Sequence, residues 1–207
     1  SNGPYGGEQV GFFYDKAQWQ RQEQATYWLS PTPSLPSLGW DAKHFRIVYS
    51  LKLYHKITGV PWHCWTTHLS AFGAKARLEG VKMISELIQP LMEQKPAPKL
   101  LLADDFNAHS RSAVYRQLQK WGNLGDAQRM ASASNKRTAY TFSGVDARWT
   151  WQKLALHCLY PNYMHRRIDY VWASPAVQVA HCTTSRWTYA QGRYYPSDHL
   201  PVVVDCH

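Results

Sequence analysis

The stretch that most constrains the fold is residues 100–109, which read LLLADDFNAH. Its apolar first half follows two prolines and a lysine, and an unbroken apolar run of this kind predicts a strand buried on both faces. Side chains alternate along a strand, so Asp105 and Asn107 should share one face while Asp104 points to the other. A carboxylate and an amide oxygen side by side are ligands suited to Mg²⁺ or Mn²⁺. Asp and Asn at a strand end also often cap a turn, so both interpretations stay open at this point.

The composition favours one folded domain. At 207 residues with 44% hydrophobic residues, the chain is long enough for a sizeable core and is not generally disordered. No apolar stretch approaches the length of a membrane span, and the first residues lack a signal-peptide pattern. The 23 Lys and Arg outnumber the 14 Asp and Glu, which suggests a polyanionic partner or surface, although many basic proteins have neither. The four cysteines lie far apart without zinc-finger spacing, and they leave disulfides and redox compartment open.

The hydrophobic pattern alternates between strands and helices, which is typical of an α/β domain with mixed sheets. Predicted strands cover residues 8–16, 100–105, 166–173, 177–187 and 201–204, and residues 45–54 and 62–69 form an antiparallel hairpin. Predicted helices cover 74–91, which Pro90 should kink or end, and 111–121. Residues 30–40 should form a loop and 123–138 an irregular segment, while 140–153 suggest a short hairpin or an aromatic loop.

Polar side chains follow the predicted strands at several ends, namely Glu8, His68, Asp105, Asn107, Asp169 and the Ser197-Asp198-His199 run. Ligands and catalytic groups of α/β proteins gather at such sheet edges. Taken singly, each has an ordinary structural explanation, because a lone glutamate is usually solvated and a strand-end histidine is usually structural. Together they could supply what phosphodiester cleavage needs: a metal site, a group that activates water, and a donor for charge on the phosphoryl oxygens.

The order and wording of these pieces resemble the endonuclease/exonuclease/phosphatase superfamily, the deoxyribonuclease I-like fold. The matching pieces are Gly7-Glu8, Thr67-His68-Leu69, Ala76-Arg77, Asp105-Phe106-Asn107, Arg167-Ile168-Asp169-Tyr170 and Ser197-Asp198-His199-Leu200-Pro201-Val202. They span almost the whole chain. The resemblance implies a single domain over residues 1–207, built as a layered sandwich of two mixed β-sheets flanked by helices.

The resemblance also implies roles for two histidine–carboxylate pairs. His199 would be the active-site histidine, and Asp169 the carboxylate that orients and charges it. His68 would be a second histidine that hydrogen-bonds a phosphate oxygen, with Glu8 as its partner. A carboxylate beside an imidazole raises the imidazole pKa and fixes its tautomer, so these pairings agree with the expected chemistry.

The remaining matched positions imply a site for a divalent cation and a phosphate. Asp105 and Asn107 would position water together with the metal or the phosphate, and Asp198 would be a metal ligand. The implied cofactor is Mg²⁺ or Mn²⁺. Arg77, one turn into the predicted helix, is either a solvated arginine or a phosphate contact.

The chain departs from the family pattern at two places. Asp104 stands where the family usually has Gly, and we expect this to alter packing at the turn rather than to add a ligand. The family also begins earlier, with an Asn-bearing strand and then a Glu that is a principal metal ligand, and nothing before Glu8 matches either. These residues are therefore expected to be the C-terminal portion of a longer domain and to be catalytically impaired alone.

The favoured function is metal-dependent hydrolysis of phosphoester bonds by a nuclease or related phosphodiesterase. Nucleic acid would suit the positive charge, but a phosphatase acting on a lipid or a small phosphoester would use the same fold. A non-catalytic family member is a second hypothesis. A basic nucleic-acid-binding module unrelated to the family is a third, which the order of the motifs opposes. Residues 149–163 are either a substrate-facing loop or a packing insert.

Overall fold

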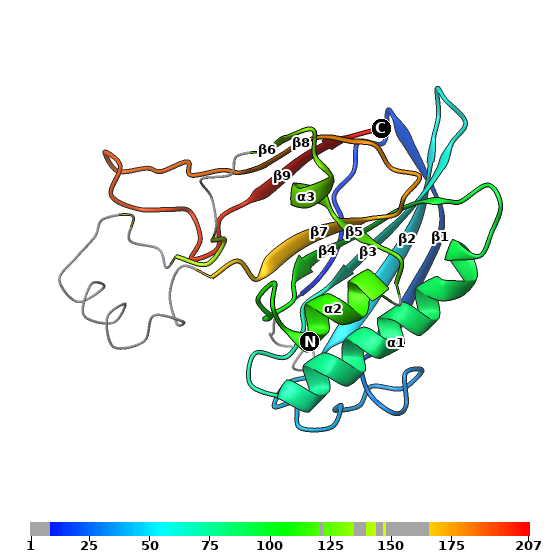
Figure 1. The fold of residues 1–207 in the computed structure, drawn as a ribbon, viewed down its shortest axis with the longest axis horizontal. Helices are drawn as coiled ribbons and strands as arrows, with labels where there is room; N and C mark the ends of the chain where they lie inside the picture. Colours follow the sequence, from blue (N-terminus) through cyan, green and yellow to red (C-terminus); the bar gives the residue numbers. More distant parts are fainter. Residues whose placement is uncertain (1–8, 121, 135–139, 144–146, 148–165) are drawn as a thin grey trace.

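The computed structural model describes residues 9–120, 122–134, 140–143, 147 and 166–207 (Figure 1). The strands are β1 (Trp19–Trp28), β2 (Ile47–His55), β3 (Pro61–Thr67), β4 (Lys99–Asp105), β5 (Gly125–Asp126), β6 (Ala133–Ser134), β7 (Asp169–Ala173), β8 (Val179–Thr184) and β9 (Val202–Cys206). The helices are α1 (Ala74–Met92), α2 (Ala113–Lys120) and α3 (Ala127–Met130). Glu8 and most of the 140–163 region lie outside the described residues.

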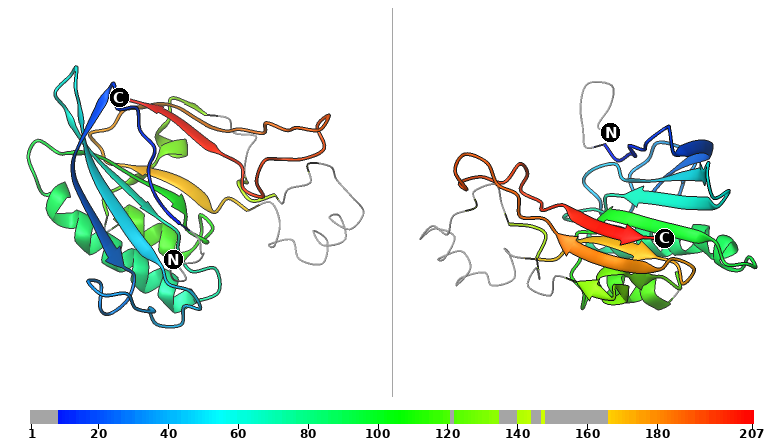
Figure 2. Two further views of the ribbon diagram at one scale, coloured as in Figure 1. Left: turned by 180° about the vertical axis from the view of Figure 1, so that it is seen from behind. Right: turned by 90° about the horizontal axis from the view of Figure 1, so that it is seen from above.

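The described strands form two mixed β-sheets. The six-stranded sheet has the order β1-β2-β3-β4-β7-β5, in which β3 and β4 are parallel and the other neighbours are antiparallel. In the smaller sheet, β8 lies between a parallel β6 and an antiparallel β9. Figure 2 shows both sheets from two further directions. The predicted α/β class with mixed sheets is therefore confirmed.

Two hydrophobic clusters define the layers. The first lies between one face of the six-stranded sheet and the helices α1 and α2, which pack side by side (Figure 1). Helix α1 contributes Val81, Ile84 and Ile88, which are fully buried at the three- and four-residue spacing of a helix face. The second cluster lies between the two sheets, where side chains of β3, β4 and β7 meet those of β8 and β9. The order of layers is thus helices, large sheet, small sheet.

The predicted hairpin of residues 45–54 and 62–69 is confirmed by β2 and β3, and the predicted long helix by α1. Pro90 lies inside the last turn of α1, which ends two residues later at Met92. The side chain of Asp41 accepts hydrogen bonds from the backbone N–H groups of Lys75 and Ala76, so a distant loop caps the start of this helix.

The predicted first strand over residues 8–16 is wrong. Residues 9–15 are not in a strand, and a turn held by Asp15 leads into β1, which begins at Trp19. The sequence of β1 is WQRQEQATYW; it is an edge strand, and most of its side chains are exposed. An edge strand of this kind lacks the apolar alternation that would reveal it. The segment 123–138 was predicted to be irregular, but its described part contains β5, α3 and β6.

The topology brings several strand ends to one edge. The parallel strands β3 and β4 both finish there, at Thr67 and Asp105. Strand β7 is antiparallel to β4, with Asp169 in register with Asp105, so it begins at the same edge. Among the described residues, no helix is both long enough and apolar enough to cross a bilayer.

Candidate active site

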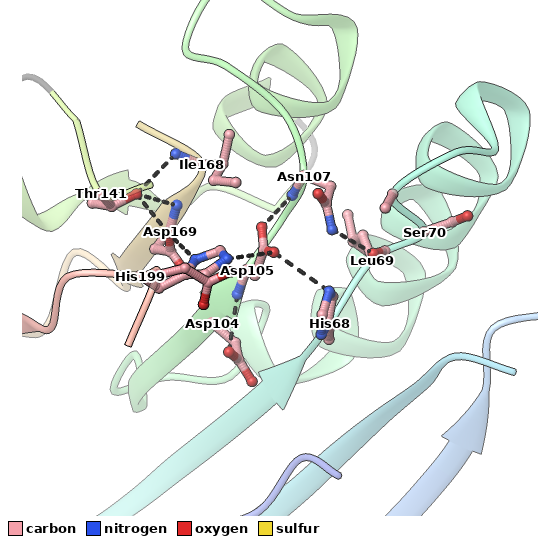
Figure 3. A network of polar contacts seen from close by, with 12 residues as sticks. His68, Leu69, Ser70, Asp104, Asp105, Asn107, Thr141, Ile168, Asp169 and His199 are labelled. Atoms are coloured by element: carbon pink, nitrogen blue, oxygen red, sulfur yellow. Dashed lines mark hydrogen bonds and ion pairs between the residues drawn. The ribbon is translucent and has the colours of Figure 1, made fainter. Parts of the chain in front are cut away.

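Asp105 occupies the centre of the edge at which β3, β4 and β7 meet (Figure 3). Its side chain is only 7% exposed, and its Oδ2 lies 3.4 Å from His68 Nε2 and 4.0 Å from His199 Nε2. Its Oδ1 accepts a 2.7 Å hydrogen bond from the backbone N–H of Asn107. One carboxylate therefore faces both predicted histidines with one oxygen, while the other oxygen is held by the turn after β4.

Asp169 and His199 form the pair that the resemblance implied. His199 Nδ1 lies 2.9 Å from Asp169 Oδ2 and 3.0 Å from Oδ1. The hydrogen bond to Asp169 raises the pKa of His199 to about 9, against an opposing effect of burial. The imidazole is therefore protonated at neutral pH. Its other nitrogen, Nε2, is the one directed at Asp105.

Burial is the main cause that raises the pKa of Asp105 to about 7, and the neighbouring Asp169 adds to it. Two carboxylates are thus held close together where solvent screens them poorly. Ligand atoms of Asp105, Asp169 and His199 all lie within 4.8 Å of one another. Hard carboxylate oxygens suit Mg²⁺ or Mn²⁺, and a bound cation would relieve the repulsion between the two acids. The residues present fit the expected metal ion.

Asn107 and Arg77 hold the loop that follows His68. Asn107 adopts a positive φ of 45°, and its Nδ2 donates a 2.9 Å hydrogen bond to the carbonyl of Leu69. Arg77 Nη1 donates to the carbonyls of Ser70 and Ala71 at 2.7 and 2.8 Å. Both side chains therefore fix the position of the loop next to His68. Their contacts with phosphate stay predictions.

Another predicted site residue, Asp198, is not part of this cluster. Asp198 is exposed beside His199, and its carboxylate accepts a 3.3 Å hydrogen bond from Ser197 Oγ. Within the described residues, the group of possible ligand atoms leaves Asp198 out, so its role as a metal ligand stays a prediction. Glu8 lies outside the described residues, and so does its expected pairing with His68.

A cavity of about 510 Å³ opens beside the cluster, between the two sheets. Asp104, Asp169 and His199 line it together with residues of β3, β7 and the start of β9. The site is therefore reachable from a pocket of a size that suits a small ligand or part of a larger one.

Asp104 is a strained residue next to this centre. Its φ is 125°, a backbone conformation that favours glycine. Its carboxylate accepts hydrogen bonds from Thr66 Oγ1 at 2.8 Å and from the backbone N–H of Asp105 at 3.0 Å. Burial raises the pKa of this carboxyl group. Asp104 is not among the possible metal ligands found in the described residues, in line with the expectation of altered packing rather than an added ligand.

The strain at Asp104 predicts an inverted order of stability for two variants. Glycine in a strand is normally less stable than alanine by about 0.5–1 kcal/mol. Here D104G should be more stable than D104A by about 1–3 kcal/mol, because only alanine keeps a Cβ in the unfavourable backbone conformation. Denaturant unfolding followed by tryptophan fluorescence measures the difference. Equal stability of the two variants would show that the backbone at residue 104 carries no strain.

A buried polar network at the start of β7 was not predicted from the sequence. Arg167 forms a bidentate ion pair with Asp126, at 2.6 Å from Nη1 to Oδ2 and 2.5 Å from Nη2 to Oδ1. Tyr115 donates a 2.7 Å hydrogen bond to the same Oδ2, and the Arg167 guanidinium lies over the Tyr170 ring. Arg167 belongs to a matched motif, but Asp126 and Tyr115 gave no signal because their partner is distant in sequence.

These features define the class of protein: an α/β domain in which acidic side chains and histidines meet at a sheet edge. Residues 15–199 match the sequence model of the Endonuclease/Exonuclease/phosphatase family, and the chain belongs to this family. A search of curated proteins found no match.

Solved structures agree with this assignment. The mannosyl-6-phosphatase Bt3783 of Bacteroides thetaiotaomicron is 27% identical, with a TM-score of 0.72 over 94% of this chain and 69% of that one. A functionally unknown conserved protein from Enterococcus faecalis is 26% identical, with a TM-score of 0.75 and the same coverage. TDP2 of D. rerio, at 16% identity and a TM-score of 0.62 over 93% of this chain and 70% of that one, shares the fold.

Proposed function

We propose that the protein hydrolyses phosphoester bonds with the help of Mg²⁺ or Mn²⁺, and that phosphodiesters are its preferred substrates. The observation that carries the proposal is the arrangement of His199, whose Nδ1 is held by Asp169 while its Nε2 faces the buried Asp105. The family membership of residues 15–199 supports the same class of reaction.

The side chains divide the chemistry between a cationic donor and an anionic acceptor. Protonated His199 can hydrogen-bond a phosphoryl oxygen and stabilise the negative charge that builds on it during attack. Asp105, whose Oδ2 faces both histidines, is placed to position the attacking water together with the cation. His68, 3.4 Å from Asp105, is placed to orient that carboxylate or to contact a second phosphate oxygen.

Asp105 and Asp169 would hold the cation, with Asn107 and Asp198 as further predicted ligands. When bound, such an ion supplies Lewis-acid polarisation of the phosphoryl group and charge neutralisation. The glutamate expected upstream of Glu8 stays a prediction, and the coding sequence before Ser1 tests it.

Metal affinity should depend on pH in a way that identifies Asp105. Its pKa of about 7 means that a proton competes with the metal below neutrality, so Mn²⁺ affinity should rise about tenfold per pH unit from pH 5.5 to 7. His199, with a pKa of about 9, keeps its charge over this range and contributes no pH dependence. Electron paramagnetic resonance titration of Mn²⁺ measures the affinity without any substrate. D105N should lose most of the affinity and its pH dependence; an unchanged titration would remove Asp105 from the site.

Substrate comparison tests the proposed reaction. Bis-p-nitrophenyl phosphate, p-nitrophenyl phosphate and a single-stranded oligonucleotide should be offered with Mg²⁺, Mn²⁺ or a chelator. We expect metal-dependent cleavage of the diesters, and oligonucleotide binding that weakens steeply between about 50 and 200 mM salt. A flat salt response would favour a small phosphoester. No metal-dependent cleavage of any substrate by a folded protein that binds Mn²⁺ would favour a non-catalytic family member, because intact metal binding excludes impairment through a missing ligand.

A phosphatase acting on a sugar phosphate is the second candidate. It is favoured by the likeness to a structure described as a mannosyl-6-phosphatase, which is 27% identical over 94% of this chain. Faster release of phosphate from mannose 6-phosphate than cleavage of either diester would select this candidate. The same folded preparation and the same chelator control serve both comparisons.

A further inference from the structure

We propose that Thr141 is a positioning residue that holds the Asp169 carboxylate in the orientation required by His199. Among the predicted site residues, the Thr141 side chain contacts Asp169, and it acts through that carboxylate. The inference rests on the proposed function only for its kinetic test, since the contacts themselves are independent of any reaction.

The Thr141 hydroxyl is fully committed by its hydrogen bonds (Figure 3). Its oxygen accepts hydrogen bonds from the backbone N–H groups of Ile168 and Asp169, at 3.1 and 3.0 Å. A threonine hydroxyl has two acceptor positions and one donor, so these two bonds fill the acceptor positions. Its single proton is then available for Asp169 Oδ2, which lies 2.5 Å away.

The other possible acceptor for this proton is much less favourable. The carbonyl of Arg166 lies 3.5 Å from Thr141 Oγ1 and already accepts the backbone N–H groups of Thr141 and Phe142. The short distance to Asp169 and the charge on that group therefore decide the direction of the hydroxyl. Thr141 is also completely buried, so water does not compete for these bonds.

The backbone of Thr141 ties the same carboxylate to the segment that carries His199. The Thr141 carbonyl accepts a hydrogen bond from the backbone N–H of Leu200, the residue after His199. Phe142 forms an isolated bridge with His199, and the two rings lie 5.0 Å apart. One residue thus sets both the distance between the strand segments of Asp169 and His199 and the rotation of the Asp169 side chain.

This rotation matters because Asp169 fixes the direction of the imidazole. Thr141 anchors Oδ2, and both carboxylate oxygens then face His199 Nδ1 at 2.9–3.0 Å. Without the hydroxyl, the carboxylate would be free to turn, and His199 Nε2 would lose its fixed direction toward Asp105. Groups that orient a ligand or catalytic residue in this way typically contribute 10–100-fold to affinity or activity.

The kinetic test compares T141V with T141S. Valine keeps the shape of threonine but removes the hydroxyl, so kcat should fall about 10–100-fold while KM changes little. Serine keeps the hydroxyl and should restore kcat to within about threefold of the native value. Equal loss of kcat in both variants would show that the methyl group and its packing matter, and would overturn the proposal.

A spectroscopic test does not depend on activity. The His199 Nδ1 proton, assigned by its loss in H199A, should give a downfield proton resonance that T141S retains and T141V shifts or broadens. If T141V fails to fold, T141C replaces it, because a thiol of similar size is only a weak donor. A resonance unchanged in a folded variant without the hydroxyl would refute the assignment, even if the wild-type protein cleaves no phosphoester.

Ser174 offers a matched control. Its buried hydroxyl accepts the Leu100 N–H at 3.1 Å and donates to the Pro98 carbonyl at 2.7 Å, at the opposite end of the β4–β7 pair. S174A removes a comparable hydrogen-bonded hydroxyl and should leave kcat and the His199 resonance unchanged. If S174A had the same effects as T141V, general loss of stability would explain both.

Discussion

In a complete, active form of the protein, replacement of His199 by alanine should lower turnover by about 10²–10⁴-fold and leave the fold intact. The imidazole is 30% exposed at the sheet edge and belongs to neither hydrophobic cluster, so its removal opens no cavity in the main cores. The lost group is the charged donor that Asp169 holds toward Asp105. Steady-state kinetics on the best diester, with circular dichroism as a check of folding, measures the effect.

His181 provides the control for this substitution, because it is an exposed histidine on β8 outside the site. H181A should keep native turnover. Near-native turnover of folded H199A would remove His199 from the mechanism.

The H199A variant should also change the pH dependence of the free energy of unfolding. The pKa of His199 rises from 6.5 in the unfolded chain to about 9 in the folded protein, so the folded state binds the proton more tightly. This contribution is fully present below pH 6.5 and is lost as the pH rises through 9. The stability difference between wild type and H199A should therefore shrink over this interval in denaturant titrations.

The second large effect concerns the buried pair of Asp126 and Arg167. D126A should lower the free energy of unfolding by about 3–5 kcal/mol, because it leaves the largely buried guanidinium of Arg167 without its anionic partner. Tyr115 loses its acceptor in the same variant. Urea unfolding followed by tryptophan fluorescence measures the loss.

The double variant D126A/R167M separates an unpaired charge from a loss of packing. It should recover much of the stability lost in D126A, since apolar replacement of a buried pair is often close to neutral. E79A, which breaks the more exposed Glu79–Lys82 pair on α1, should change stability by less than about 1 kcal/mol. A similarly small effect of D126A would mean that Arg167 finds another partner.

The parts of the fold that could be predicted from sequence are those with a local signal. Helix α1 was predicted because Val81, Ile84 and Ile88 repeat at helical spacing, and β4 because its apolar run is continuous. Strand β1 could not be predicted, because an exposed edge strand carries mostly polar residues. The short elements β5 and β6 depend on distant strands for their pairing, which no local pattern encodes.

Prediction of the candidate site from sequence has the same limit, because only residues in local motifs could be identified. Asp105, Asp169 and His199 could be proposed because each stands in a motif at a strand end, and the structure brings all three together. Thr141 and Asp126 act on partners 28 and 41 residues away, and neither stands in a recognisable motif. Their importance follows from the contacts that the fold creates.

The β4–β7 ladder has a consequence for how the protein would fail under mild stress. His68 and Asp105 lie on the β3–β4 side of this ladder, whereas Asp169 and His199 belong to the chain from β7 onward, and Asp105 pairs with Asp169 across the ladder. Opening of this ladder, together with the parts of both hydrophobic clusters that cross it, would separate the two halves while α1 and the β1–β4 strands kept their structure. Inactivation would then precede the loss of helical signal, and amide hydrogen exchange in β7 would report it first.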